Sequence, residues 1–181
     1  DCILIRTSAF DELVIDAAAG TARVGAGVHW GRLLRELDGT ALVALAGSNP
    51  TINIVGFTIG GGHSSLGRTY GLAAHSVLAV EMVTADGAAV RVTGDGDAEL
   101  LWALKGGGGQ FGVVTALEFR LHPAPEGGRL YGGKLTFPAA VAAPVLRAMA
   151  DVAASAPEPL SISAVMMVLP DLPVVPEPLR G

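Results

Sequence analysis

The stretch that decides the fold is AGSNPTINIVGFTIGGGHSSLGRTYGL, residues 46–72, which places seven glycines among hydroxyl residues and short aliphatic side chains. Because glycine lacks a Cβ atom, its backbone can pass very close to a flat or phosphorylated ligand and direct N–H groups at it. Ser48, Thr51 and Ser64 add hydroxyl donors to the same surface. The stretch predicts one wall of a cofactor site, although an isolated triple glycine is equally typical of tight turns between strands.

A second glycine-rich stretch is LLWALKGGGGQFGVVTALEFRLHP, residues 100–123. It joins a short amphipathic helix to a glycine run and then to a strongly β-prone strand. Two glycine-rich crossings in one small chain favour a ligand that both of them share.

Composition bounds the class of protein. The chain has 181 residues, of which half are apolar, so it can form one ordinary domain and part of another. The net charge is −5 and the basic residues are scattered, which argues against nucleic-acid binding. The single cysteine, Cys2, excludes an internal disulfide and a multi-cysteine metal site, and no metal site is predicted.

No apolar run reaches the roughly 18 residues of a membrane span, and the first residues lack the layout of a signal peptide. We therefore expect no membrane partner and a cytoplasmic location. The chain begins at Asp1, inside a strand-like run and without an initiator Met, and it ends after a proline-rich stretch. We expect a fragment of a longer protein, in which a signal peptide stays an open question.

The order of the patterns predicts an α+β fold. Strands are expected at 2–6, 13–16 and 111–121, a strand followed by a helix across 21–37 with Gly39 ending the helix, and a hairpin that turns at Asp86-Gly87. A helix is expected after Asp95–Asp97. Beyond Pro123 the sequence predicts a strand near 134–137, a helix starting near Pro138 and a strand over 160–169.

Three segments together resemble a known family. TARVGAGVHWGRLLREL, then GSNPTINIVGFTIGGGHSSLGRTYGLAAHSVLAVEMVTADG, then DAELLWALKGGGGQFGVVTALEFRLHP occur in the order and spacing of the FAD-binding domain of the vanillyl-alcohol oxidase and p-cresol methylhydroxylase (PCMH) superfamily. The chain is most similar to the berberine-bridge-enzyme-like, FAD-linked oxidase branch. The resemblance implies that residues 1–123 are the C-terminal part of a PCMH-type FAD-binding domain, with a mixed or antiparallel sheet and flanking helices. It also implies that residues 124–181 begin a truncated α+β substrate-binding domain.

The resemblance also implies cofactor-binding residues. In the family, the segments matching 48–56 and 60–70 line the pyrophosphate and isoalloxazine of FAD, and the segment matching 111–114 meets the adenine side through its backbone. The implied cofactor-binding residues in this chain are Ser48, Asn49, Thr51, Ile52, Asn53, Ile54, Val55, Gly56, Gly60, Gly61, His63, Gly112 and Val114.

The chain departs from the family pattern at two positions. Asn49 stands where many relatives carry a cysteine bonded to flavin C6, so a cysteinyl link is excluded here. Asn53 replaces a usual glycine, where it either crowds the pyrophosphate or donates a hydrogen bond to it.

A histidyl link to the flavin 8α carbon, common in the family, belongs to an earlier RxGGHS-type loop. This chain does not contain that loop, so such a link would lie in a missing N-terminal segment. His63 lies in a similar string but in the register of the later motif, and we expect it to face or pack on the flavin edge. Tyr70, Tyr131, His75 and His122 are expected to be structural, and the catalytic residues stay unknown.

The implied function is that of an FAD-dependent oxidoreductase. The full-length parent would transfer a hydride from a C–H or CH–OH group of a small-molecule substrate to the flavin, which O₂ or another acceptor reoxidises. The fragment alone is expected to be inactive because part of the cofactor pocket is absent. Two alternatives are an NAD(P)H-linked flavin reductase of the same superfamily and a flavin-free, non-catalytic remnant. The substrate, the electron acceptor and the oligomeric state are not indicated by the sequence.

Overall fold

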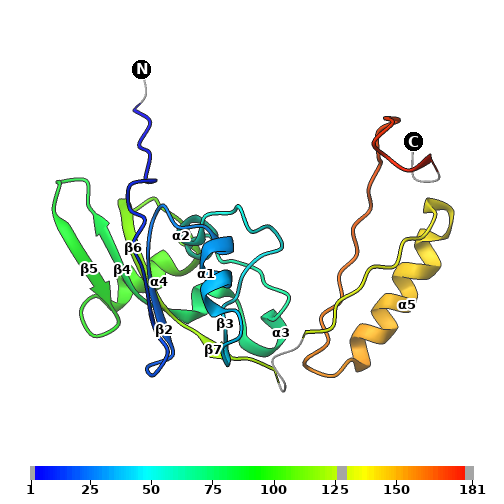
Figure 1. Ribbon diagram of the computed structural model, residues 1–181, viewed down its shortest axis with the longest axis horizontal. Helices are drawn as coiled ribbons and strands as arrows, with labels where there is room; N and C mark the ends of the chain where they lie inside the picture. The colour runs from blue at the N-terminus through cyan, green and yellow to red at the C-terminus, as the bar shows by residue number, and fades with distance from the viewer. Residues whose placement is uncertain (1–2, 126–129, 178–181) are drawn as a thin grey trace. The chain divides into compact units, whose positions relative to one another are not determined.

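The computed structural model describes residues 3–125 and 130–177, and the chain divides into two compact units, Asp1–Tyr131 and Gly132–Gly181. The first unit is built on a five-stranded antiparallel sheet in the order β1-β2-β6-β4-β5 (Figure 1). Its strands are β1 Leu13–Asp16, β2 Thr21–Gly25, β4 Val77–Val83, β5 Ala89–Thr93 and β6 Val113–Arg120. Two short strands, β3 Leu42–Val43 and β7 His122–Pro123, form a separate pair.

The hairpin predicted at Asp86-Gly87 connects β4 to β5. Gly87 has a φ of +84°, and its backbone N–H donates to the carbonyl of Thr84 at 2.9 Å. A positive φ is readily accessible to glycine, which explains why this pair of residues marks the turn. β5 lies at the edge of the sheet.

Helices cover one face of the sheet and enclose the core. They are α1 Trp30–Leu37, α2 Ile54–Ile59, α3 Gly67–Tyr70 and α4 Ala98–Gly107, with the 3₁₀ turn η1 Ala73–Ser76. Trp30, Leu33 and Leu104 from the helices are buried in one cluster with Val80 and Leu117 from the sheet. The helices predicted within 21–37 and after Asp97 are confirmed, and Gly39 follows the end of α1 with a φ of +73°.

α2 and α3 are helices in the stretch 46–72, for which the sequence predicted a cofactor-site wall and no helix. α2 forms because Asn53 caps its first turn and because its apolar side chains recur at helical spacing, with Ile54, Val55 and Ile59 buried. The β-branched residues of α2 and Gly56 have poor helix propensity, so the sequence did not indicate a helix here despite the helical spacing of the apolar residues. The tertiary contacts override the local preference.

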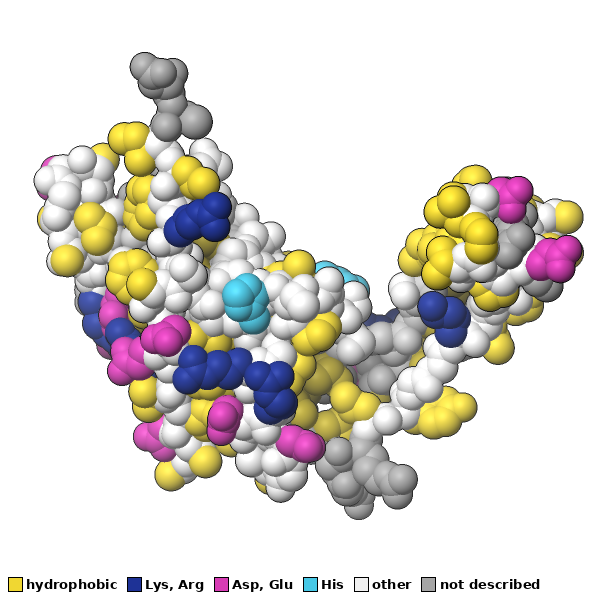
Figure 2. Space-filling model, turned by 45° about the horizontal axis from the view of Figure 1, so that its top comes forward, with side chains coloured by type: hydrophobic (Ala, Val, Ile, Leu, Met, Phe, Trp, Pro, Cys, Tyr) yellow, Lys and Arg dark blue, Asp and Glu magenta, His cyan; other side chains and the backbone are white. Residues whose placement is uncertain are grey.

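The opposite face of the sheet carries a row of ion pairs. Arg23 Nη2 lies 2.7 Å from Glu81 Oε2, and Arg91 Nη1 lies 2.8 Å from Glu81 Oε1. Arg23 also pairs with Glu12, and Arg91 with Glu118. We call these five residues the ion-pair row. Figure 2 shows basic and acidic side chains standing next to one another on the face of the molecule that it presents.

The second unit contains the helix predicted near Pro138. The 3₁₀ turn η3 Ala139–Val141 follows that proline and leads into α5 Ala142–Ser155. The strand predictions at 134–137 and 160–169 are wrong, because in the described part of this unit those residues form no ladder. A β-prone segment becomes a strand only when another strand pairs with its backbone groups.

The prediction of a strand at 2–6 is also wrong over residues 3–6, which lie in an irregular segment, while Cys2 lies outside the described residues. Ile3 and Leu4 in this segment are 91% and 76% exposed. At the other end of the first unit, the backbone N–H of Ala124 donates to the carbonyl of Ala41 at 2.8 Å. The domain boundary at residue 123 stays a prediction, and the first compact unit extends a few residues past it.

The ion-pair row makes stability depend on pH. The hydrogen bond from Arg23 holds the pKa of Glu81 below its usual range, and Coulombic attraction to Arg23 and contacts with Arg91 add to this effect. Glu81 therefore stabilises the fold fully above the ordinary glutamate range and loses this contribution as the pH falls through its lowered pKa. For Glu81→Gln we expect a lower free energy of unfolding near neutral pH, with a difference from the parent chain that shrinks on acidification.

Urea unfolding between about pH 7 and about pH 3 measures this difference. Glu36→Gln is the matched control, because Glu36 is exposed on α1 and forms no ion pair with another described residue. A Glu81→Gln profile that runs parallel to the parent curve would show that the ion-pair row does not control acid stability.

Candidate cofactor site

Asn49 organises the exposed turn that precedes α2. Its side-chain Oδ1 accepts hydrogen bonds from the backbone N–H of Thr51 at 2.9 Å and from the Thr51 hydroxyl at 2.8 Å. The N–H of Ile52 donates to the carbonyl of Asn49 at 3.3 Å. An Asx turn of this kind fixes the backbone while Ser48, Asn49 and Thr51 stay exposed. The residue in the position of the family's cysteine therefore has a structural use in this chain.

Asn53 joins α2 to the strand and helix beside it. Its Oδ1 accepts from the N–H of Gly56 at 2.9 Å, and its Nδ2 donates to the carbonyls of Ala26 at 2.6 Å and Val28 at 3.3 Å. The side-chain amide is thus used within the protein. The two roles considered for Asn53, crowding of the pyrophosphate and donation to it, stay predictions, while the amide forms these three bonds within the protein.

The backbone N–H of Asn53 points away from His29, the residue opposite it. His29 and Asn53 form an isolated antiparallel bridge, in which the N–H of Trp30 donates to Ile52 at 3.1 Å and the N–H of Ile54 donates to Val28 at 3.0 Å. Because the flanking residues make these bonds, the N–H of Asn53 itself points away from the bridge. Ile54 is fully buried, so its side chain serves the core. Val55 is 4% exposed, whereas Gly56 is exposed and Ile52 is 43% exposed.

Two segments flank α2, and we call residues 47–51 the first arm and residues 60–64 the second arm. In the second arm Gly61 and Gly62 have φ values of +107° and +71°. Their carbonyls accept hydrogen bonds from the N–H groups of Ala74 at 2.9 Å and Ala73 at 2.8 Å. Gly60 and His63 are exposed beside them. The second arm is therefore anchored to η1 while part of it stays open to solvent.

The structure brings the two glycine-rich stretches together. α4 bends at Lys105 and Gly106, and the N–H of Gly108 then donates to the carbonyl of Ile59 at 3.0 Å. A Cβ atom added at Gly61, Gly108 or Gly109 would meet no atom within 4 Å. At Gly109 neither a positive φ nor a neighbouring atom requires glycine. A bare backbone with open space in front of it suits the close approach of a ligand.

Gly112 and Val114 lie at the start of β6. A Cβ atom at Gly112 would come within 2.5 Å of Met82 Cε and of the Val83 carbonyl oxygen, so glycine here permits close packing against β4. Val114 is 7% exposed, which leaves its backbone as the part able to meet a ligand. The N–H of Ala26 donates to the carbonyl of Thr115 at 2.8 Å, and Ala26 in turn accepts from Asn53. Gly112 and Val114 are thus connected to the start of α2 through the sheet.

The tyrosine and histidine residues of this region have structural partners. Tyr70 stacks on His122 with ring centroids 4.4 Å apart, and its hydroxyl donates to the Pro123 carbonyl at 2.9 Å. His122 Nε2 lies 2.8 Å from Ser76 Oγ. Burial lowers the pKa of His122, and the nearby Arg120 lowers it further, so the imidazole is neutral at neutral pH. Packing is the role that these contacts support for Tyr70 and His122.

His75 Nδ1 accepts a hydrogen bond from the N–H of Leu72 at 3.4 Å, whereas Tyr131 is fully exposed. Within residues 3–125 and 130–177, the structure contains no group of three or more His, Cys, Asp or Glu residues able to hold a metal ion. The contacts described for Tyr70, Tyr131, His75 and His122 give none of these residues a catalytic role.

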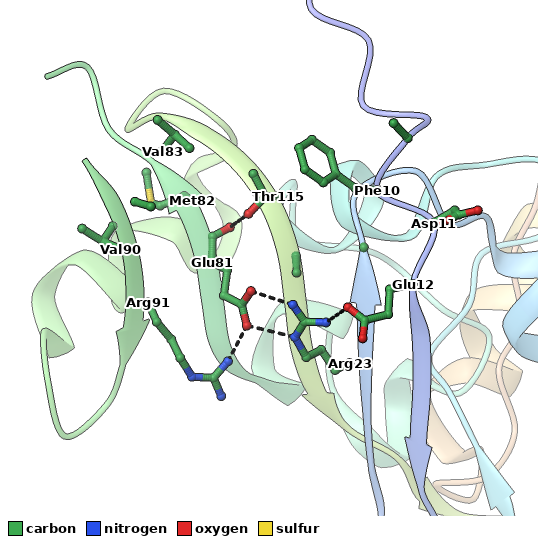
Figure 3. Close-up of a pocket in the computed structure, with 14 residues that line it drawn as sticks. Phe10, Asp11, Glu12, Arg23, Glu81, Met82, Val83, Val90, Arg91 and Thr115 are labelled. Carbon is green, nitrogen blue, oxygen red and sulfur yellow. Dashed lines mark hydrogen bonds and ion pairs between the residues drawn. The ribbon is translucent and has the colours of Figure 1, made fainter. Parts of the chain in front are cut away.

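The described part of the first unit carries hollows on its surface. One, of about 630 Å³, opens over the ion-pair row beside Phe10 (Figure 3), where Arg23 reaches Glu12 and Glu81, and Arg91 approaches Glu81 from the other side. The arginine and glutamate charges in this hollow pair with one another, whereas Asp11 also lines it and forms no ion pair with another described residue.

A second hollow, of about 490 Å³, is lined by Thr51 of the first arm together with His29, Arg32 and Arg35 of the α1 region. Sequence reasoning treated these two arginines as scattered charges and missed that they come close to Thr51. Their spacing of three residues along a helix is the only signal that places them on one face.

The chain is similar to known flavoproteins. Residues 1–93 match the family model of the FAD binding domain. The chain is 33% identical over 163 residues to FAD-dependent monooxygenase FUP4 of Fusarium proliferatum, which covers 89% of this chain and 31% of that protein. It is 34% identical over 135 residues to (R)-6-hydroxynicotine oxidase of Paenarthrobacter nicotinovorans, covering 75% of this chain and 29% of that protein.

Solved structures give the same picture. Crystalline 6-hydroxy-D-nicotine oxidase of Arthrobacter nicotinovorans matches with a TM-score of 0.62 and 37% identity, over 64% of this chain and 26% of that one. BBE-like 1 of Physcomitrella patens matches with a TM-score of 0.61 and 34% identity, over 65% of this chain and 26% of that one.

Fold and comparisons define the class as an FAD-binding domain of the PCMH type. The chain belongs to the FAD-linked oxidoreductases of the vanillyl-alcohol oxidase and p-cresol methylhydroxylase superfamily, which include berberine bridge enzyme and its relatives. The α+β fold and FAD as the family's cofactor are thereby confirmed. The chain spans about a third of the length of the two curated relatives, at 31% and 29%. No helix in the described ranges is long and apolar enough to cross a membrane.

Asn53 provides a direct test of how the site is built. Asn53→Ala removes the cap of α2 and leaves the carbonyls of Ala26 and Val28 without this donor, so we expect a loss of about 2–3 kcal/mol in the free energy of unfolding. Asp97→Ala is the matched control, since Asp97 caps α4 through a single bond of 2.9 Å to the N–H of Leu100. We expect about 1 kcal/mol for that variant. Equal losses in urea unfolding would show that the amide of Asn53 acts only as a cap.

Proposed function

We propose that the full-length protein is an FAD-dependent oxidoreductase that oxidises a small-molecule substrate at a C–H or CH–OH group. The observation that carries the proposal is the hydrogen bond from Gly108 to Ile59, which joins two glycine-rich stretches into one surface. That surface occurs in a chain of the FAD-binding domain family. Relatives named as nicotine-derivative oxidases support a small molecule as the class of substrate.

The residues present fit the chemistry of FAD. The first arm would hold the cofactor with the hydroxyl of Ser48, because the Thr51 hydroxyl donates its proton to Asn49 Oδ1, and the start of α2 would add the outward N–H of Asn53. The open backbone of the second arm and the exposed His63 would line the same cofactor. When bound, FAD accepts a hydride from the substrate and passes the electrons on to O₂ or another acceptor.

Other parts of the sequence-based account stay proposals. Gly112 and Val114 would meet the adenine side through their backbone, and any covalent link to FAD would involve a residue other than Asn49, which has no thiol. Residues 124–181 would begin the substrate-binding domain. We also propose a cytoplasmic location without nucleic-acid or membrane partners, on the basis of the scattered charges and the pattern of hydropathy.

Gly61 tests the function against a matched glycine. Gly61 and Gly87 both have a positive φ, of +107° and +84°, and a Cβ atom at either would meet no atom within 4 Å. Replacing either residue by alanine strains the backbone by about 1–2 kcal/mol. In the full-length protein we expect Gly61→Ala to weaken FAD binding at least about tenfold, because its methyl group would occupy open space in the proposed cofactor site.

Gly87→Ala lies at the tip of the β4–β5 hairpin and should bind FAD as the unmodified protein does. Titration of the flavin-free full-length protein with FAD, followed by flavin fluorescence, measures both constants. An unmodified full-length protein that does not bind FAD would overturn the proposed function. Equal FAD affinities in the two variants would show that Gly61 is not part of the cofactor site.

A further inference from the structure

The ring of Phe57 lies between the two arms that flank α2. A Cβ atom at Gly47, in the first arm, would lie 2.8 Å from Phe57 Cε2. A Cβ atom at Gly62, in the second arm, would lie 2.8 Å from Phe57 Cε1. These two carbons belong to opposite edges of the ring. Each arm therefore runs along one edge, at a distance that only a glycine permits.

The ring is held from the protein side. The N–H of Phe57 donates to the carbonyl of Asn53 at 3.2 Å, which places the residue in the first turns of α2. Trp30 packs edge-on against the ring, with centroids 5.5 Å apart and planes at 89°, and is itself 1% exposed. Through its backbone N–H Trp30 also holds Ile52, just beyond the first arm. The ring cannot withdraw into the core without moving the buried indole.

The second arm is confined on its other side as well. A Cβ atom at Gly62 would lie 2.6 Å from the Cβ of Ala73, whose N–H donates to the Gly62 carbonyl. Gly62 is thus fixed between the ring of Phe57 and η1. The first arm has its own support in the Asx turn of Asn49. Phe57 is the nearest side chain to a Cβ built at Gly47 and the second nearest at Gly62, so its ring limits how closely the two arms approach each other.

We propose that Phe57 is a positioning residue that fixes the separation of the two arms and thereby shapes the cofactor site. The inference rests on the proposed function, because it assigns both arms to the same FAD molecule. A leucine in its place would be shorter than the ring and would leave space on one or both edges. The two arms would then adopt a range of separations. Part of the free energy of FAD binding would be used to restore the separation that fits the cofactor.

Phe119 provides the control. It is 3% exposed on β6 and packs edge-on against the same Trp30, with centroids 6.2 Å apart, but it is not among the nearest neighbours of Gly47 or Gly62. Phe57→Leu and Phe119→Leu therefore both loosen the packing of Trp30, and both should lower the thermal midpoint of the full-length protein. Only Phe57→Leu should raise the dissociation constant of FAD, by about tenfold, and change the visible circular dichroism of the bound flavin.

Both variants are compared below their thermal midpoints, so that unfolding does not contribute to the measured affinity. Equal affinities and equal flavin spectra in the two variants would overturn the positioning role while leaving the proposed function intact. Failure of the unmodified full-length protein to bind FAD would overturn the proposed function and, with it, the role of Phe57.

A double-mutant cycle tests the contact itself without flavin. Gly47→Ala places a methyl group against the ring edge, and Gly47 does not have the positive φ that would add backbone strain. Alone, this change should raise the unfolding equilibrium constant of the full-length protein about tenfold; in a Phe57→Leu background, the additional rise should be less than about threefold. Additive effects would overturn the inference that the ring limits the position of the first arm.

Discussion

The site depends on the side-chain amide of Asn53. This one group starts α2 by capping it, and it binds the carbonyls of Ala26 and Val28 between β2 and α1. Ala26 in turn donates to Thr115 on β6, so the start of α2 is tied to a central strand. Since both arms are the chain segments on either side of α2, their placement follows from this connection. The family that the chain resembles usually has a glycine at this position, whereas in this chain the Asn53 side chain holds the start of α2.

In the proposed site most of the groups that would meet the cofactor belong to the backbone, and the charged side chains of Arg32 and Arg35 line a hollow with Thr51. Glu81 and its arginine partners occupy the face of the sheet opposite the helices, where they neutralise one another. The two arms, in contrast, carry no acidic or basic side chain other than His63. A surface of N–H groups and hydroxyls suits a ligand with phosphate and carbonyl oxygens, because each donor is directional and adds no net charge.

Local signals predicted much of the fold, and long-range contacts account for the rest. The Asp86-Gly87 turn, the spacing of α1 and the Asp97 cap act within a few residues, so the sequence alone revealed them. α2 was missed because its stability comes from burial and from Asn53. The strand expected at 160–169 was wrong because pairing depends on a second strand.

The candidate site shows the same division between local and long-range signals. The resemblance indicated its residues, but the contacts of Phe57 with Gly47 and Gly62 join positions that no sequence spacing relates. The visible absorption spectrum of the full-length protein, recorded before and after acid precipitation, tests the central claim most directly. The account predicts flavin absorption bands that accompany the purified protein, with flavin in the acid pellet only where a residue other than Asn49 binds it covalently. A colourless full-length protein that takes up no added FAD would contradict the account.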